Sequence, residues 1–129
     1  TVKNIGSKIW LSLIVKDKVH LLSGHPMKDV YKLAEDQIDC LMLNCNTIEK
    51  TDHTLQLMID DWGSAWGVYP NLGITEPEPD GEIEKKVDKN YFENIIRKYL
   101  KMKPKIIGSC CGSLPIHTKI IKELTLQSI

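Results

Sequence analysis

IDCLMLNCNTIEKTDHTLQLMIDDWGSAWGVY, residues 38–69, is the stretch that decides the fold. It opens with an apolar run at 38–44, which predicts a strand, and it closes with a second apolar run at 65–69. Between them, four apolar side chains repeat at the spacing of one helix face: Leu55, Met58, Ile59 and Trp62. A strand, a helix and a strand in this order predict parallel pairing through a right-handed crossover.

The same alternation continues on both sides of this stretch. Before it, the apolar run 9–15 predicts a strand buried on both faces, and helical spacing follows at Met27, Val30, Tyr31 and Ala34. After it come a helical pattern (Phe92, Ile95, Ile96, Tyr99), a strand at 105–109 and a last helical pattern (Ile116, Ile120, Ile121, Leu124). The predicted class is therefore α/β, with four parallel βα units.

Four units in 129 residues amount to half of an eight-unit barrel, whose usual size is about 250 residues. A flavodoxin-like open sheet is the competing fold. It normally has a glycine-rich phosphate loop after the first strand, whereas Lys16-Asp17-Lys18 follows Val15 here. The first residue, Thr1, is not a methionine, which favours an excerpt of a longer protein.

Composition excludes several classes of protein. The chain is 42% hydrophobic and 26% charged, which is typical of a globular protein. Its 17 basic and 17 acidic side chains balance, so no charge footprint predicts nucleic acid or an anionic membrane as a partner. No apolar run approaches the roughly 20 residues of a membrane helix. No signal peptide is recognisable, so we expect a cytoplasmic protein.

The four cysteines do not resemble a disulfide scaffold, and we expect free thiols or metal-bound thiolates. Strand alternation points Cys40 away from Cys45, which predicts a buried apolar role for Cys40. Cys45, Cys110 and Cys111 follow the second and fourth predicted strands, at the ends where parallel α/β folds place their sites. Three thiolates suit zinc with one open position. On spacing alone, a metal site and three buried thiols remain equally open.

Three segments change this balance: residues 106–113 with their Gly-Ser-Cys-Cys-Gly core, residues 43–45 with Asn-Cys, and residues 68–73 with Tyr-Pro-Asn. Together with Ser12 and Lys16-Asp17, they resemble the homocysteine S-methyltransferase family over nearly the whole chain. The resemblance implies a (β/α)8 TIM barrel, of which residues 1–129 would be the C-terminal half, with strands five to eight.

The resemblance also implies a chemistry. Cys45, Cys110 and Cys111 would bind Zn²⁺, and the open position would take the thiol of homocysteine. Binding to zinc deprotonates a thiol that is otherwise mostly protonated at neutral pH. Its sulfur would accept a methyl group from a small donor and give methionine. Family members use betaine, S-methylmethionine, S-adenosylmethionine or a methylated folate, and nothing in the sequence chooses among them.

Other residues have predicted roles around this site. Asn44 and Asn71 follow the second and third strands and are predicted to bind substrate or orient its neighbours, with turn formation as the alternative for Asn71. Gly112 and Ser113 are expected to open the last helix, with Ser113 as its N-cap and the positive end facing the cysteines. The polar segment 72–90 is either a substrate lid or a solvated loop.

The family's N-terminal half, with the acidic residue that holds the substrate amino group, has no counterpart in these 129 residues. We therefore expect the chain to be inactive alone, and to self-associate or to need the missing half. Two other functions stay open at this stage: a non-catalytic zinc-stabilised half-barrel scaffold, and an α/β binding domain with buried free cysteines.

Overall fold

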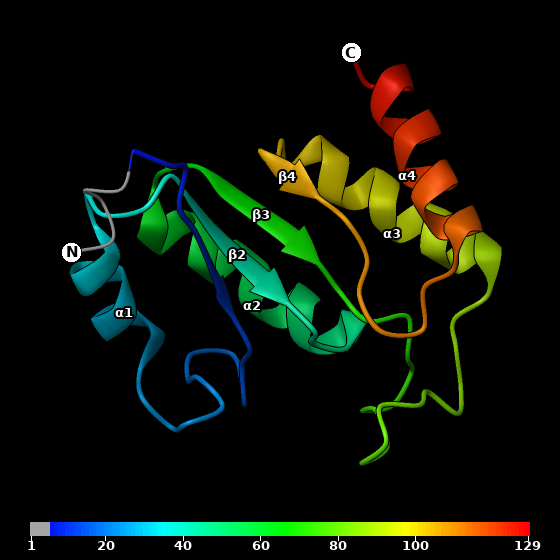
Figure 1. Ribbon diagram of the computed structural model, residues 1–129, viewed down its shortest axis with the longest axis horizontal. Helices are drawn as coiled ribbons and strands as arrows, with labels where there is room; N and C mark the ends of the chain where they lie inside the picture. The colour runs from blue at the N-terminus through cyan, green and yellow to red at the C-terminus, as the bar shows by residue number, and fades with distance from the viewer. Residues whose placement is uncertain (1–5) are drawn as a thin grey trace.

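The computed structural model describes residues 6–129 and contains strands and helices in strict alternation (Figure 1). In chain order they are β1 (Trp10–Leu13), α1 (Met27–Ala34), β2 (Cys40–Asn44), α2 (Ile48–Trp62), β3 (Trp66–Tyr69), α3 (Lys89–Lys101), β4 (Ile106–Ile107) and α4 (Pro115–Gln127). The sheet has the order β1-β2-β3-β4, and every neighbouring pair is parallel. The predicted α/β class with four parallel βα units is confirmed.

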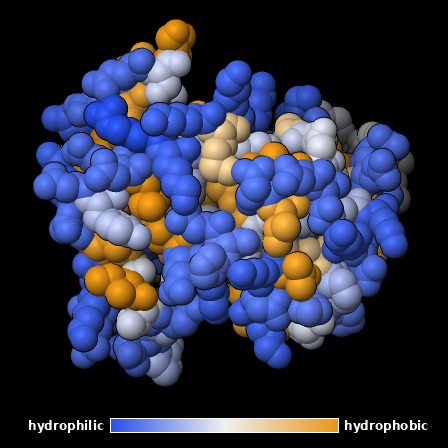
Figure 2. Space-filling view, turned by 180° about the vertical axis from the view of Figure 1, so that it is seen from behind, coloured by the Kyte–Doolittle hydropathy of each residue, from blue (hydrophilic) through white to orange (hydrophobic). Residues whose placement is uncertain are grey.

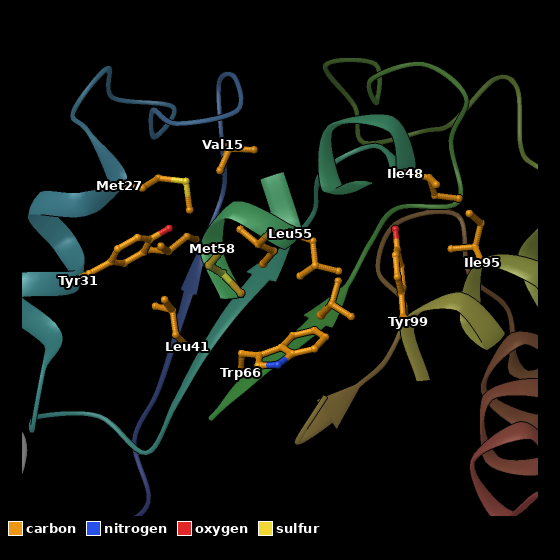
Figure 3. Packing of buried hydrophobic residues seen from close by; sticks show 13 residues of the cluster. Val15, Met27, Tyr31, Leu41, Ile48, Leu55, Met58, Trp66, Ile95 and Tyr99 are labelled. Carbon is orange, nitrogen blue, oxygen red and sulfur yellow. The ribbon is translucent and has the colours of Figure 1, made fainter. Parts of the chain in front are cut away.

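The main core lies between one face of the sheet and the helices α1, α2 and α3 (Figure 3). Alternate strand residues supply the sheet side of this core: Leu13, Leu41, Leu43, Trp66 and Val68. Leu41, Leu43 and Val68 are fully buried, and each such side chain contributes about 1.5–3 kcal/mol through burial. A second cluster joins α3 to α4 through Phe92, Ile96, Ile120, Ile121 and Leu124.

The opposite face of the sheet, which we call the open face, carries the other set of strand residues. Ser12 and Tyr69 share a hydrogen bond of 2.6 Å between their hydroxyl groups on this face. A side chain does not fit at Gly67 on this face, because an added Cβ would lie 2.8 Å from the Ile106 carbonyl oxygen. Trp10 is 60% exposed, so the expectation that the first strand is buried on both faces is wrong. Within the described residues, β1 is an edge strand whose one neighbour in the sheet is β2.

The first and last strands are shorter than predicted. β1 ends at Leu13, and Val15 then pairs with Leu21 in an antiparallel bridge as the chain turns back. β4 contains only two residues, although Gly108 still donates a backbone hydrogen bond of 2.9 Å to Val68. After β1 the chain turns back before the apolar run ends, whereas after β4 it continues extended to the turn at 111–112.

The start of α4 also differs from the prediction. Ser113 does not cap this helix, because its hydroxyl donates to the Cys110 carbonyl oxygen at 2.6 Å. The N-cap is Leu114, whose amide donates to Nδ1 of His117 at 2.9 Å, and Pro115 occupies the first helical position. A proline is suited to that position because its missing N–H has no partner within a helix.

Seen from behind, the surface is mainly hydrophilic, with hydrophobic side chains in separate small patches (Figure 2). Within residues 6–129, no helix is both long enough and apolar enough to cross a lipid bilayer.

Candidate metal centre

Three cysteines from two distant segments meet at the carboxyl edge of the sheet. Cys45 follows β2 directly, and Cys110 and Cys111 lie in the turn after β4. Their sulfur atoms all lie within 4.8 Å of one another. Parallel pairing explains the meeting, because it brings the carboxyl ends of the strands to the same edge (Figure 1). We call Cys45, Cys110 and Cys111 the cysteine trio.

The spacing of the cysteine trio fits a tetrahedral metal ion. The sulfurs of Cys45 and Cys111 are 4.0 Å apart. Two thiolates bound to one zinc ion at about 2.3 Å each lie about 3.8 Å from one another. All three residues are half-buried. The donor set therefore fits a soft or borderline divalent ion such as zinc.

In this structure the sulfurs of Cys45 and Cys110 are in contact, and the Cα atoms of the two residues are 5.7 Å apart. The two residues are 65 positions apart in sequence, so only the folded sheet brings them within bonding range. Cys111 keeps a free thiol. Because metal binding requires thiolates, all three sulfurs become ligands only when this pair is reduced.

Cys40 lies outside the trio, as predicted. It is buried, with 1% of its surface exposed, and its thiol is free. Burial raises the pKa of the Cys40 thiol above its ordinary value, although the positive charge of Lys105 acts in the opposite direction. Cys40 is therefore a small core residue and an unreactive thiol.

The backbone is strained at the trio. Cys45 has a φ of 52°, in the left-handed region that non-glycine residues rarely adopt. This conformation turns the chain out of β2. Left-handed backbone costs about 1–2 kcal/mol for such a residue, so the surrounding structure must hold it in place.

Asn44 and Asn71, the two asparagines predicted to bind substrate, lie in different surroundings. Asn44 ends β2 in register with Tyr69, half-buried, on the open face of the sheet. Asn71 is fully buried. Its side-chain amide donates to the Cys45 carbonyl oxygen at 3.0 Å and accepts from the Cys111 amide at 3.2 Å. Asn71 therefore contacts the trio through the backbone of Cys45 and Cys111.

Sequence reasoning missed Asn46. This residue is 1% exposed, and its Oδ1 accepts a 2.9 Å hydrogen bond from the Val15 amide, which ties the end of β1 to the Cys45 turn. Its Nδ2 has no hydrogen-bond partner among the residues that the structure describes. The available signal was a polar residue immediately after an apolar strand, at the edge where sites form.

The segment 72–88 folds back on itself beside the trio. Ile74 donates to the Lys85 carbonyl and Val87 donates to the Leu72 carbonyl, at 2.9 and 2.8 Å. Ile83 is buried, and its side chain lies against Gly73 and the turn at Gly112. This part of the predicted loop is therefore anchored by backbone hydrogen bonds and by one apolar side chain next to Cys111.

The expected role of the last helix is not met at Gly112 and Ser113. Both residues precede Leu114, the N-cap of α4, so their amides belong to the turn after β4 and not to the first turn of the helix. Gly112 has a φ of 80°, which only glycine adopts readily. The turn is thus shaped by the Gly112 backbone, and the helix begins beyond it.

The sequence model of the homocysteine S-methyltransferase family matches residues 1–125 of the 129. The chain belongs to this family. It is 25% identical over 127 residues to a homocysteine S-methyltransferase from Escherichia coli strain K12, covering 90% of this chain and 38% of that protein. It is 24% identical over 128 residues to a selenocysteine Se-methyltransferase from Brassica oleracea var. italica, covering 92% and 37%. The chain thus spans little more than a third of these curated relatives.

Solved structures of the E. coli homocysteine methyltransferase MmuM share the fold of this family member. The metallated form superposes with a TM-score of 0.71 at 24% identity and covers 91% of this chain and 35% of that one. The apo form gives 0.70 at 23% identity, covering 92% and 40%. The oxidised form gives 0.69 at 23% identity, covering 91% and 36%.

Proposed function

We propose that this chain is the metal-binding part of a zinc-dependent homocysteine S-methyltransferase. The chain would form the C-terminal half of the barrel, with strands five to eight, within a longer enzyme. The observation that carries the proposal is the cysteine trio, with its sulfurs within 4.8 Å, in a chain that belongs to this family.

Cys45, Cys110 and Cys111 would be the protein ligands of Zn²⁺, and homocysteine would supply the fourth sulfur. When bound, the ion lowers the pKa of a thiol, so that homocysteine would be present as the thiolate. The reduced trio needs a reducing compartment, which favours the cytosol.

The reaction itself would be a transfer of a methyl group to sulfur. The homocysteine thiolate would attack the methyl carbon of the donor, forming a C–S bond, while the bond from that carbon to the donor would break and leave its electron pair on the donor. An onium or otherwise activated methyl group is required for this step, which is the chemistry shared by betaine, S-methylmethionine, S-adenosylmethionine and methylated folates. The products would be methionine and the demethylated donor.

The residues described here have separate tasks in this scheme. The trio would hold and orient the acceptor sulfur. Asn44, on the open face at the end of β2, would contact the substrate. The segment 72–88, anchored through Ile83 beside Gly112, would form one wall and limit the access of water.

The test is the zinc content of the reduced chain with single substitutions. We expect roughly one zinc per chain in the parent and loss of stoichiometric zinc in Cys110→Ser, because two sulfurs no longer satisfy a tetrahedral site. Cys40→Ala is the matched control: it removes a buried cysteine outside the trio and should retain zinc. Full zinc in Cys110→Ser would show that the ligand assignment is wrong.

Homocysteine binding separates the enzyme from a zinc-stabilised scaffold. The cobalt-substituted chain should change its thiolate-to-metal absorption when homocysteine is added, because a fourth sulfur joins the metal. Zinc binding with no response to homocysteine would instead favour the scaffold. Absence of both would favour a binding domain with buried cysteines.

A further inference from the structure

Tyr69, the last residue of β3, and the three residues that follow it, Pro70-Asn71-Leu72, lie between the two segments that carry the cysteine trio. We call them the β3 exit segment. Their backbone contacts both sides. The Cys45 amide donates to the Tyr69 carbonyl at 3.3 Å, and the Cys110 amide donates to the Pro70 carbonyl at 2.9 Å. The backbone of this segment therefore connects the turn that contains Cys45 to the turn that contains Cys110 and Cys111.

Two further backbone hydrogen bonds connect the β3 exit segment to the same two turns. Asn71 donates to the Asn46 carbonyl and Leu72 donates to the Cys111 carbonyl, both at 2.9 Å. The backbone bonds of the β3 exit segment therefore reach all three cysteines or their direct neighbours. These bonds depend on the main chain, which any sequence can supply.

The Asn71 side chain adds what the main chain cannot. It donates to the Cys45 carbonyl and accepts from the Cys111 amide, so a single amide group spans the two turns. A carboxylate lacks the donor, and a glutamine amide stands one carbon further out. Since Asn71 is 0% exposed, removing its side chain leaves the Cys45 carbonyl and the Cys111 amide without this partner in a buried site, which is costly.

The bond to the Cys45 carbonyl also acts on a strained residue. Cys45 has a left-handed backbone with a φ of 52°, and the orientation of its peptide decides where its sulfur points. Removing the Asn71 donor frees this peptide to relax, which would move one sulfur relative to the other two.

We propose that Asn71 is a positioning residue of the metal centre: its side-chain amide sets the distance between the Cys45 turn and the Cys110–Cys111 turn. This rests on the proposed function for the identity of the metal, and it departs from the expectation that Asn71 binds substrate. It predicts that Asn71 controls metal affinity and the proximity of the thiols without touching the metal.

The first experiment measures zinc affinity of the reduced full chain by competition with a chelating dye, and the visible spectrum of its cobalt form. Asn71→Ala should bind zinc about 10- to 100-fold more weakly, the usual effect of losing a residue that orients metal ligands. Its cobalt bands should shift. Ile96→Val, a conservative change in the buried α3 core, is the control for general destabilisation and should match the parent in both readouts.

The second experiment needs no metal. In glutathione buffers, the reduced chain exchanges its Cys45 and Cys110 thiols for a disulfide while oxidised glutathione becomes two reduced molecules. The equilibrium gives the effective concentration of one thiol at the other. We expect Asn71→Ala to lower it about tenfold or more, in line with the loss of ligand orientation, and Ile96→Val to leave it unchanged.

The outcomes separate this inference from the proposed function. Unchanged zinc affinity, cobalt spectrum and effective thiol concentration in a folded Asn71→Ala would overturn the positioning role. If the parent binds no zinc, the proposed function fails, and the glutathione equilibrium alone still decides the role of Asn71.

Discussion

At the scale of single residues, Gly112 shows how the site constrains its turn. Its φ of 80° is in the left-handed region. A Cβ added there would lie 3.2 Å from Cδ1 of Ile83 and 3.4 Å from Cβ of Leu72. Conformation and space therefore both demand glycine directly after Cys111.

Gly112→Ala should lower the free energy of unfolding by more than the about 1–2 kcal/mol expected for a left-handed alanine alone, because the new methyl group also displaces Ile83. Urea denaturation measures the loss. Gly81→Ala is the matched control, since Gly81 has a φ of 86° and no atom within 4 Å of an added Cβ. Equal losses in the two variants would contradict the role of Ile83 packing.

At the scale of elements, α4 depends on a histidine at its start. Nδ1 of His117 accepts the Leu114 amide at 2.9 Å, and the His117 ring packs edge-on against Phe92 of α3 with centroids 5.0 Å apart. Burial lowers the pKa of His117 below its ordinary value. Only a neutral ring nitrogen accepts a hydrogen bond, so this cap exists in the unprotonated state.

The lowered pKa fixes the direction of the pH effect. The unfolded chain takes up the His117 proton first as pH falls below about 6.5, so the cap stabilises the fold fully above that pH and progressively less below it. Urea denaturation between about pH 7 and about pH 5 should therefore show His117→Gln with a weaker pH dependence than the parent, because glutamine accepts the same bond without titrating in that range.

His25→Gln is the control for this experiment, since His25 lies in the exposed turn before α1 and should leave the pH dependence near that of the parent. A His117→Gln chain that loses stability with falling pH as steeply as the parent would refute the assignment.

At the scale of the whole molecule, α1, α2 and α3 pack on one face of the sheet, while the open face carries both buried side chains, Cys40 and Met42, and an exposed one, Trp10. In Figure 1, α2 lies behind the strands, with α1 on one side of the sheet and α3 and α4 on the other. The open face ends at the edge strand β1, where Trp10 is 60% exposed, and Ile14, directly after β1, is 40% exposed. Exposed strand edges with apolar side chains are prone to pairing with other chains.

We therefore expect the isolated chain to self-associate at micromolar concentration and Trp10→Lys to reduce this association, as measured by light scattering. Leu33→Lys is the control, because Leu33 is 76% exposed but lies on α1, away from the open face. A monodisperse monomer of the parent chain would contradict the prediction.

Much of this protein could be read from the sequence because local patterns carry it. The apolar spacing at Leu55, Met58 and Trp62 predicts α2, and parallel pairing predicts that residues after β2 and β4 share an edge. Cys45, Cys110 and Cys111 were expected there, and the structure places their sulfurs together. Their role as ligands stays a prediction.

Other features depend on the folded geometry of the chain and not on residue type. Ser113 has the residue type of an N-cap, but the Cys110 carbonyl takes its hydroxyl and the cap moves to Leu114. Trp10 belongs to an apolar run, yet its position at the sheet edge exposes it. For Ser113 a carbonyl three residues earlier in the same turn decides the outcome, and for Trp10 the position of β1 in the sheet decides it.

The sequence by itself determined the alternation of strands and helices, since hydrophobic periodicity is a property of neighbours along the chain. Only the tertiary structure decided that Asn71 faces the backbone of Cys45 and Cys111, and that Cys45 and Cys110 are within bonding range. The physical reason is that a hydrogen bond or a sulfur–sulfur contact depends on positions fixed to a fraction of an ångström, and those positions arise only when separate segments pack together.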